Sequence, residues 1–202
     1  GDETAMSGSS IIALLTGASV TNAEAGSIDV LTDGVGLATA PELTANRRAG
    51  HFTVEASVTS SDEGEETPVP IAPVYFSLTN LASSPASIYF VGETPGAAQV
   101  TTAYDVPLEV LVQDTYGNFV TTGTVTFTAP GSDAPGATFD NASPVSNTIT
   151  VNLDSTGHAY SGPLHANTHA GTFHVTATSG TATADSDTLT STAAAAETIE
   201  ID

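Results

Sequence analysis

Short segments in which apolar and polar residues alternate fill most of the chain, and this period-two pattern is what most restricts its fold. In VPLEVLVQD, for example, Leu108, Val110 and Val112 fall on one face. Residues typical of turns, Gly, Pro, Asn and Asp, separate these segments, and no long 3.6-residue period is present. The pattern predicts an all-β chain built from antiparallel β-sandwich modules.

The chain also repeats part of itself. Residues 27–58 align without a gap on residues 148–179. An acidic insertion, SSDEGEETPVPIAP, then shifts the alignment, after which residues 76–80 align with residues 187–191. Matching positions include Ile28 with Ile149, Val30 with Val151, Asp33 with Asp154, Gly36 with Gly157, Leu43 with Leu164, Asn46 with Asn167 and Phe52 with Phe173.

The repeat predicts one complete module and one incomplete module. Residues 82–192 run through every strand of a seven-strand sandwich, whereas residues 1–81 resemble only its second half. Residues 193–202 resemble only its first strand, and we interpret them as a C-terminal strand that could be donated. A half sandwich exposes apolar faces and strand edges. We therefore expect another copy of the chain to cover it.

Composition excludes several functions. The chain has 23 Asp and Glu against 2 Lys and Arg, a net charge of −21, which argues against nucleic acid or an anionic membrane surface as partner. Its longest apolar run, residues 11–15, is far short of the about 20 residues that span a bilayer. Cysteine is absent, and no constellation of acid, base and nucleophile stands out, so we expect no enzyme.

The stretches VPLEVLVQDTYGNFVTTGTVTFTAP and AGTFHVTAT resemble the bacterial Ig-like domains of group 1, the invasin and intimin type, which occur in tandem on surface proteins. The resemblance implies Ig-like sandwiches in an exported scaffold or adhesin, located at the cell surface or outside the cell. It covers residues 82–192 well and residues 27–81 as a half module. The matching residues are Val112, Asp114, Gly117, Asn118, Val125, Phe127, Pro130, Ala170, Gly171, Phe173, Val175 and Ala177.

Two hypotheses explain why the chain is out of step with its repeat. In the first, Ile199 and Ile201 of one copy enter the open half sandwich of the next, so that the chain polymerises head to tail into a filament. In the second, the chain is a segment cut from a longer tandem adhesin that binds a host receptor or glycan. The acceptor groove of the first hypothesis would be lined by Ile28, Val30, Phe52, Val54, Phe76 and Leu78.

The densest acidic cluster, SDEGEET, is the candidate that we favour for a bound ion. Its Asp62, Glu63, Glu65 and Glu66 could bind Ca²⁺, or they could be the solvated tip of a hairpin. No other cofactor is expected. Asp114, by contrast, is expected to form a tight turn with Gly117 and Asn118.

Overall fold

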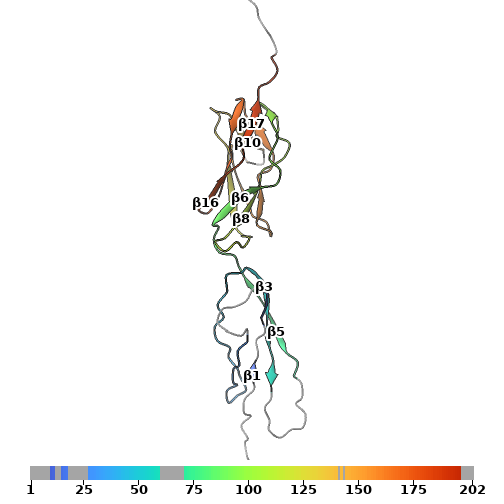
Figure 1. Ribbon diagram of the computed structural model, residues 1–202, viewed down its shortest axis with the longest axis vertical. Coiled ribbons are helices and arrows are strands. Elements are labelled where there is room, and N and C mark those ends of the chain that lie inside the picture. Colours follow the sequence, from blue (N-terminus) through green and yellow to red (C-terminus); the bar gives the residue numbers. More distant parts are fainter. Residues whose placement is uncertain are drawn as a thin grey trace, which may run out of the picture. The chain divides into compact units, whose positions relative to one another are not determined.

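In the computed structural model, residues 10–11, 15–17, 27–59, 71–140, 142 and 144–196 are described. The chain divides into two compact units, residues 1–81 and residues 82–202. All regular secondary structure in the described residues is β-strand, and none of it is helix (Figure 1). The predicted all-β fold is confirmed.

The second unit is a two-layer sandwich. In one layer β8 lies between β6 and β12, and in the other β9 and β15 lie side by side, flanked by β11 and β16. These orders are those of strands A, B and E and of strands C, F and G in an Ig-like sandwich. Its strands are β6 (Ser87–Val91), β7 (Ala98–Gln99), β8 (Glu109–Gln113), β9 (Thr124–Thr128), β10 (Ala137–Phe139), β11 (Thr148–Asn152), β12 (His158–Tyr160), β13 (Leu164–Ala166), β14 (Gly171–Phe173), β15 (Thr176–Ser179), β16 (Ala182–Asp185) and β17 (Leu189–Thr192).

The core of this unit follows from the alternation in the sequence. Val110 and Val112 of β8, together with Val125 and Phe127 of β9, are fully buried because every second side chain of each strand points between the layers. The ring of Phe127 also meets that of Phe90 on β6, edge to face, with 6.2 Å between centroids. The inward faces of the two layers therefore form a single apolar core.

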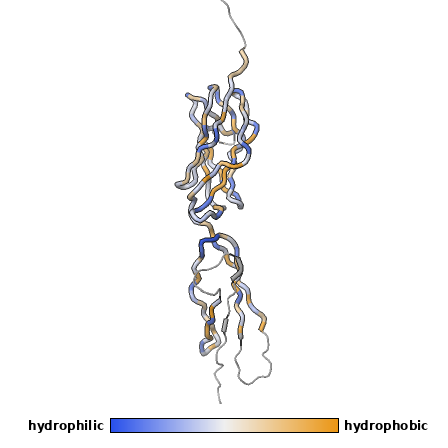
Figure 2. Tube along the Cα trace, in the orientation of Figure 1, coloured by the Kyte–Doolittle hydropathy of each residue, from blue (hydrophilic) through white to orange (hydrophobic). Residues whose placement is uncertain are grey.

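The first unit has the same layer as β9, β15 and β16, since β3 lies between β2 and β5 with both neighbours antiparallel to it. Hydrophobic residues recur along β3 and β5, orange in Figure 2. No strand occurs in residues 27–49. The strands of this unit are β1 (Ser10–Ile11), β2 (Leu15–Gly17), β3 (Gly50–Ala56), β4 (Val58–Thr59) and β5 (Val74–Asn80).

Three turns of the chain are built alike. The Oδ1 atom of Asp114 accepts hydrogen bonds from the amides of Tyr116 and Asn118, at 2.8 and 2.9 Å, and Gly117 takes a φ of 80°. Asp33 and Asp154 each bond the amides two and four residues further on in the same way. The turn predicted at Asp114 is thus confirmed. It recurs at the two positions that the repeat aligns.

The carboxylate of the Asp114 turn is also tied to another part of the fold. Its second carboxylate oxygen, Oδ2, accepts bonds from the amide and hydroxyl of Ser83 and from the side-chain amide of Asn118. Burial alone would raise the pKa of Asp114, but these hydrogen bonds outweigh it and hold the pKa well below its usual range. The carboxylate therefore anchors the start of the second unit to the end of β8.

Replacing Asp114 by Asn should destabilise the second unit by about 1–3 kcal/mol, because an amide group would face donors that now share two carboxylate oxygens. Asp154→Asn is the matched control, since that turn is exposed and should lose less. Urea titration measures the difference, with amide hydrogen exchange assigning the transition to the second unit. Equal losses in the two variants would contradict the anchoring role of Asp114.

The same carboxylate predicts an acid-dependent stability. The folded pKa of Asp114 lies below its unfolded value of about 3.9, so its contribution is full above that value and is lost as pH falls through the folded pKa. The unfolding free energy should decline in acid less steeply for Asp114→Asn than for the unaltered chain. Urea midpoints measured from pH about 5 downward test this slope. Parallel curves for the two proteins would refute it.

Candidate functional site

An apolar groove of about 380 Å³ opens in the first unit. One side comes from residues 27–49, which contribute Ile28, Val30 and Leu43. The other side comes from β3 and β5, through residues such as Val54 and Phe76. The remaining lining residues are Ala38, Ala40, Glu55, Ala56 and Leu78.

The groove lies where the complete unit has its core. Ile28 is 38% exposed, whereas its aligned partner Ile149 is 7% exposed. Leu43 is 43% exposed and its partner Leu164 is fully buried. The same residue types at matching positions are therefore covered in one unit and open in the other.

This difference in exposure arises because the described part of the first unit lacks one of the two layers of the sandwich. In the second unit, β12 pairs with β8, and Ala159 lies opposite the buried Val110. The matching segment of the first unit, residues 37–39, contains no strand. The described part of that unit has no counterpart of β6 or β8 to cover it. Residues 37–39 therefore have an alanine at the position of Ala159 in β12 but no strand opposite them in the described residues.

Five of the six residues predicted to line an acceptor groove do line this one: Ile28, Val30, Val54, Phe76 and Leu78. The sixth, Phe52, is buried on β3 and is not part of the lining. That the groove accepts a strand stays a prediction. The proposed donor residues, Ile199 and Ile201, lie outside the described residues, as do Asp62, Glu63, Glu65 and Glu66 of the acidic cluster.

Sequence reasoning missed Ala38, Ala40 and Leu43 in the lining. A signal for them was present, because the repeat aligns them with Ala159, Ser161 and Leu164, which are buried in the complete unit. The small side chains of Ala38 and Ala40 gave no hydrophobic peak, so only the alignment could have singled out these two.

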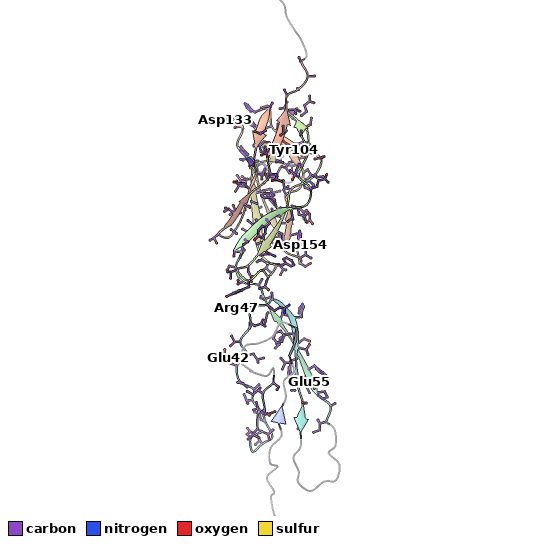
Figure 3. The ribbon with its side chains drawn as sticks, viewed as in Figure 1. Glu42, Arg47, Glu55, Tyr104, Asp133 and Asp154 are labelled. Carbon is purple, nitrogen blue, oxygen red and sulfur yellow. The ribbon has the colours of Figure 1, made fainter. Side chains whose placement is uncertain are left out.

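The charged residue that lines the groove is acidic. Glu55 of β3 belongs to the lining, and the exposed Glu42 lies on the segment that forms the other side; both are labelled in Figure 3. An occupant that brought further buried carboxylates would meet repulsion in a site of low polarity. The groove therefore favours an apolar segment whose acids can remain in water.

Histidine side chains outside the groove take part in pairs between strands. The Nδ1 atom of His158 lies 2.6 Å from Oε1 of Glu109, and that of His165 lies 2.7 Å from Oδ1 of Asp140. Hydrogen bonding to Glu109 also raises the pKa of Tyr160. Among the described residues no three His, Asp or Glu side chains gather closely enough to hold a metal ion.

No family model matches the chain, and no curated protein does. Among solved structures, the Escherichia coli adhesin FdeC is 20% identical with a TM-score of 0.41, over 94% of this chain and 55% of that one. Domains 1–6 of the surface layer protein SbsC are 15% identical with a TM-score of 0.40, over 92% of this chain and 20% of that one. The D0-D1 domain of intimin is 17% identical with a TM-score of 0.37, over 95% and 86%.

These similarities are distant, and the chain spans only a fifth to about half of the first two proteins. The Ig-like sandwich is defined instead by the strand order of the second unit. The described residues contain no helix that is long and apolar enough to cross a membrane.

An open apolar groove should bind a small apolar dye. We expect the neutral dye Nile red to fluoresce with the chain and to do so less with Phe76→Ser, because Phe76 lines the groove and is 52% exposed. Phe119→Ser is the matched control, since Phe119 is 50% exposed but lies in the second unit. An equal loss in the two variants would show that the dye does not report the groove.

Proposed function

We propose that the chain is a structural subunit of an extracellular or cell-surface filament, exported and assembled by strand donation between copies. The observation that carries the proposal is the groove of the first unit, whose apolar side chains lie open at the positions that a complete unit buries. A β-strand with alternating apolar residues is the kind of ligand that such a face binds. Asp62, Glu63, Glu65 and Glu66 are candidate ligands of a calcium ion, but assembly does not depend on calcium in this proposal.

The donor is the segment around Ile199 and Ile201 of a second copy. Its alternation places two isoleucines on one face and Thr198 and Glu200 on the other. Burying apolar surface contributes about 25 cal/mol per Å², and main-chain hydrogen bonds fix the direction of the strand. Because donor and acceptor differ, the contact repeats from copy to copy and gives an open filament unless the rotation closes a ring.

The proposal includes no catalysis. The two His–carboxylate pairs each join neighbouring segments of the sandwich, and both are partly exposed. Paired in this way, the imidazoles have a structural explanation as cross-links. We therefore assign the chain no enzymatic role.

Adhesion is the second candidate function. On the outer face of the layer formed by β6, β8 and β12, Tyr89 lies opposite Leu111, and Tyr160 is on the neighbouring strand; both tyrosines are half exposed. Exposed aromatic residues on a rigid sheet are suited to binding a receptor or glycan. This function requires a monomer with a ligand, whereas the filament requires no ligand.

Electron microscopy and light scattering of the purified chain separate the two. We expect fibres from the chain of residues 1–202 and small particles from a version lacking residues 193–202, because removing the donor leaves each groove empty. The matched control is Thr198→Ser with Glu200→Gln, which changes the outward face and keeps both isoleucines, and it should still form fibres. If all three versions remain monomeric, strand donation is wrong and the adhesin reading replaces it.

A further inference from the structure

The place that the donated strand takes in the groove can be inferred from the complete unit. This inference rests on the proposed function. By sequence, residues 197–201 align with residues 86–90, so the donor resembles β6. Among the described residues of the second unit, however, the only strand that pairs with β6 is β8. The described first unit has no counterpart of β8, so a strand placed like β6 would have no backbone partner there.

The position of β8 does have a partner. In the second unit β8 pairs antiparallel with β12, and Ala159 lies opposite Val110. The amide of Val112 donates to Gly157, and the amide of Ser161 donates to Leu108, each at 2.9 Å. In the first unit, Gly36, Ala38 and Ala40 align with Gly157, Ala159 and Ser161. Gly36 and Ala40 are exposed and Ala38 is partly exposed, so this edge is accessible to an incoming strand.

The donated strand could instead take the position of β7, but that position provides fewer backbone pairs. There β7 runs parallel to β17 over two residue pairs, Ser191 with Ala98 and Thr192 with Gln99. The β8 position offers three pairs along β12. The counterpart of Ser191, Asn80, is buried and already donates through its side chain to Asn46 and Arg48. Fewer backbone bonds would hold a strand at that edge.

Charge decides the register within the β8 position. If Ile199 lay opposite Ala38, Glu197 would fall where Leu108 lies in the complete unit, and Leu108 is 3% exposed. Burying that carboxylate without a partner would cost more than the isoleucines gain. If Ile201 lies opposite Ala38 instead, Glu197 takes the half-buried place of Val106. Ile199 then takes the apolar place of Leu108.

We propose that the donated strand of a second copy replaces β8, running antiparallel to residues 37–40 with Ile201 opposite Ala38 and Ile199 opposite Ala40. The donor would thus enter a position different from that of the strand it resembles. Thr198 and Glu200 would face solvent, as Glu109 does from β8. Both isoleucines would cover the apolar face made by Val54 and Phe76.

Disulfide trapping tests this placement, because the chain has no cysteine of its own. A chain carrying Ala38→Cys is mixed with a chain carrying Ile201→Cys, assembled under reducing conditions and then oxidised mildly. Directly paired residues of an antiparallel ladder are about 4.5–5.5 Å apart at Cα, which a disulfide can span. A crosslinked dimer should be the main product on a non-reducing gel. Leu81→Cys, at the exposed position that aligns with Thr192 of the β7 contact, is the matched acceptor control and should give only a trace.

Each other result overturns a defined part of the inference. Crosslinking through Leu81→Cys would place the donor like β7, and crosslinking of Ala38→Cys to Ile199→Cys would show the other register; in both cases strand donation stands. Assembly with no crosslink at either acceptor position would overturn the placement in β8. Light scattering of the reduced mixtures shows whether the chains assemble at all, which separates a failed placement from a failed assembly. If neither they nor the unaltered chain assemble, the proposed function fails and the placement fails with it.

Discussion

Every strand of a β-sandwich needs two things: a neighbour for its backbone and a second layer over its apolar face. The second unit meets both needs internally, since β8 pairs with β6 and β12 while its inward valines pack against β9. The described part of the first unit meets only the first of these needs. Its three-stranded layer β2, β3 and β5 is paired like the corresponding strands of the complete unit, but the described residues include no strands of a facing layer that would cover it.

The uncovered apolar face of the first unit connects the fold to the proposed assembly. The groove is apolar because its residues belong to an interior, as the burial of Ile149 and Leu164 in the complete unit shows. A chain with a net charge of −21 repels its own copies at long range. The proposed contact between copies therefore requires a short-range, apolar and directional interaction. Strand addition has these properties, and in the proposed assembly it would leave Glu200 on the outer face of the donated strand.

The two units share the same turn geometry, although the described part of the first unit lacks a covering layer. At Asp33, Asp114 and Asp154 a carboxylate oxygen bonds the amides two and four residues on, and a glycine with positive φ completes each turn. These bonds are local, so they form whether or not a second layer is present. Only Asp114 adds long-range bonds, to Ser83, and only it is buried. The turns thus share their local geometry, but their contributions to stability depend on burial and on bonds to distant residues.

The period-two alternation and the repeat by themselves determined the all-β fold, the turn at Asp114 and half of the groove lining, because these depend on neighbours along the chain or on a matching segment. The sequence could not determine that Phe52 is buried while Val54, two residues away on the same face, lines the groove. Nor could it show that residues 37–39 form no strand although their aligned partners do. Both were decided by the tertiary structure, since burial and ladder pairing depend on which distant strand lies opposite. For the same reason, sequence similarity relates residues 197–201 to β6, whereas the pairing of β8 with β12 supports the β8 position that we propose for a donated strand.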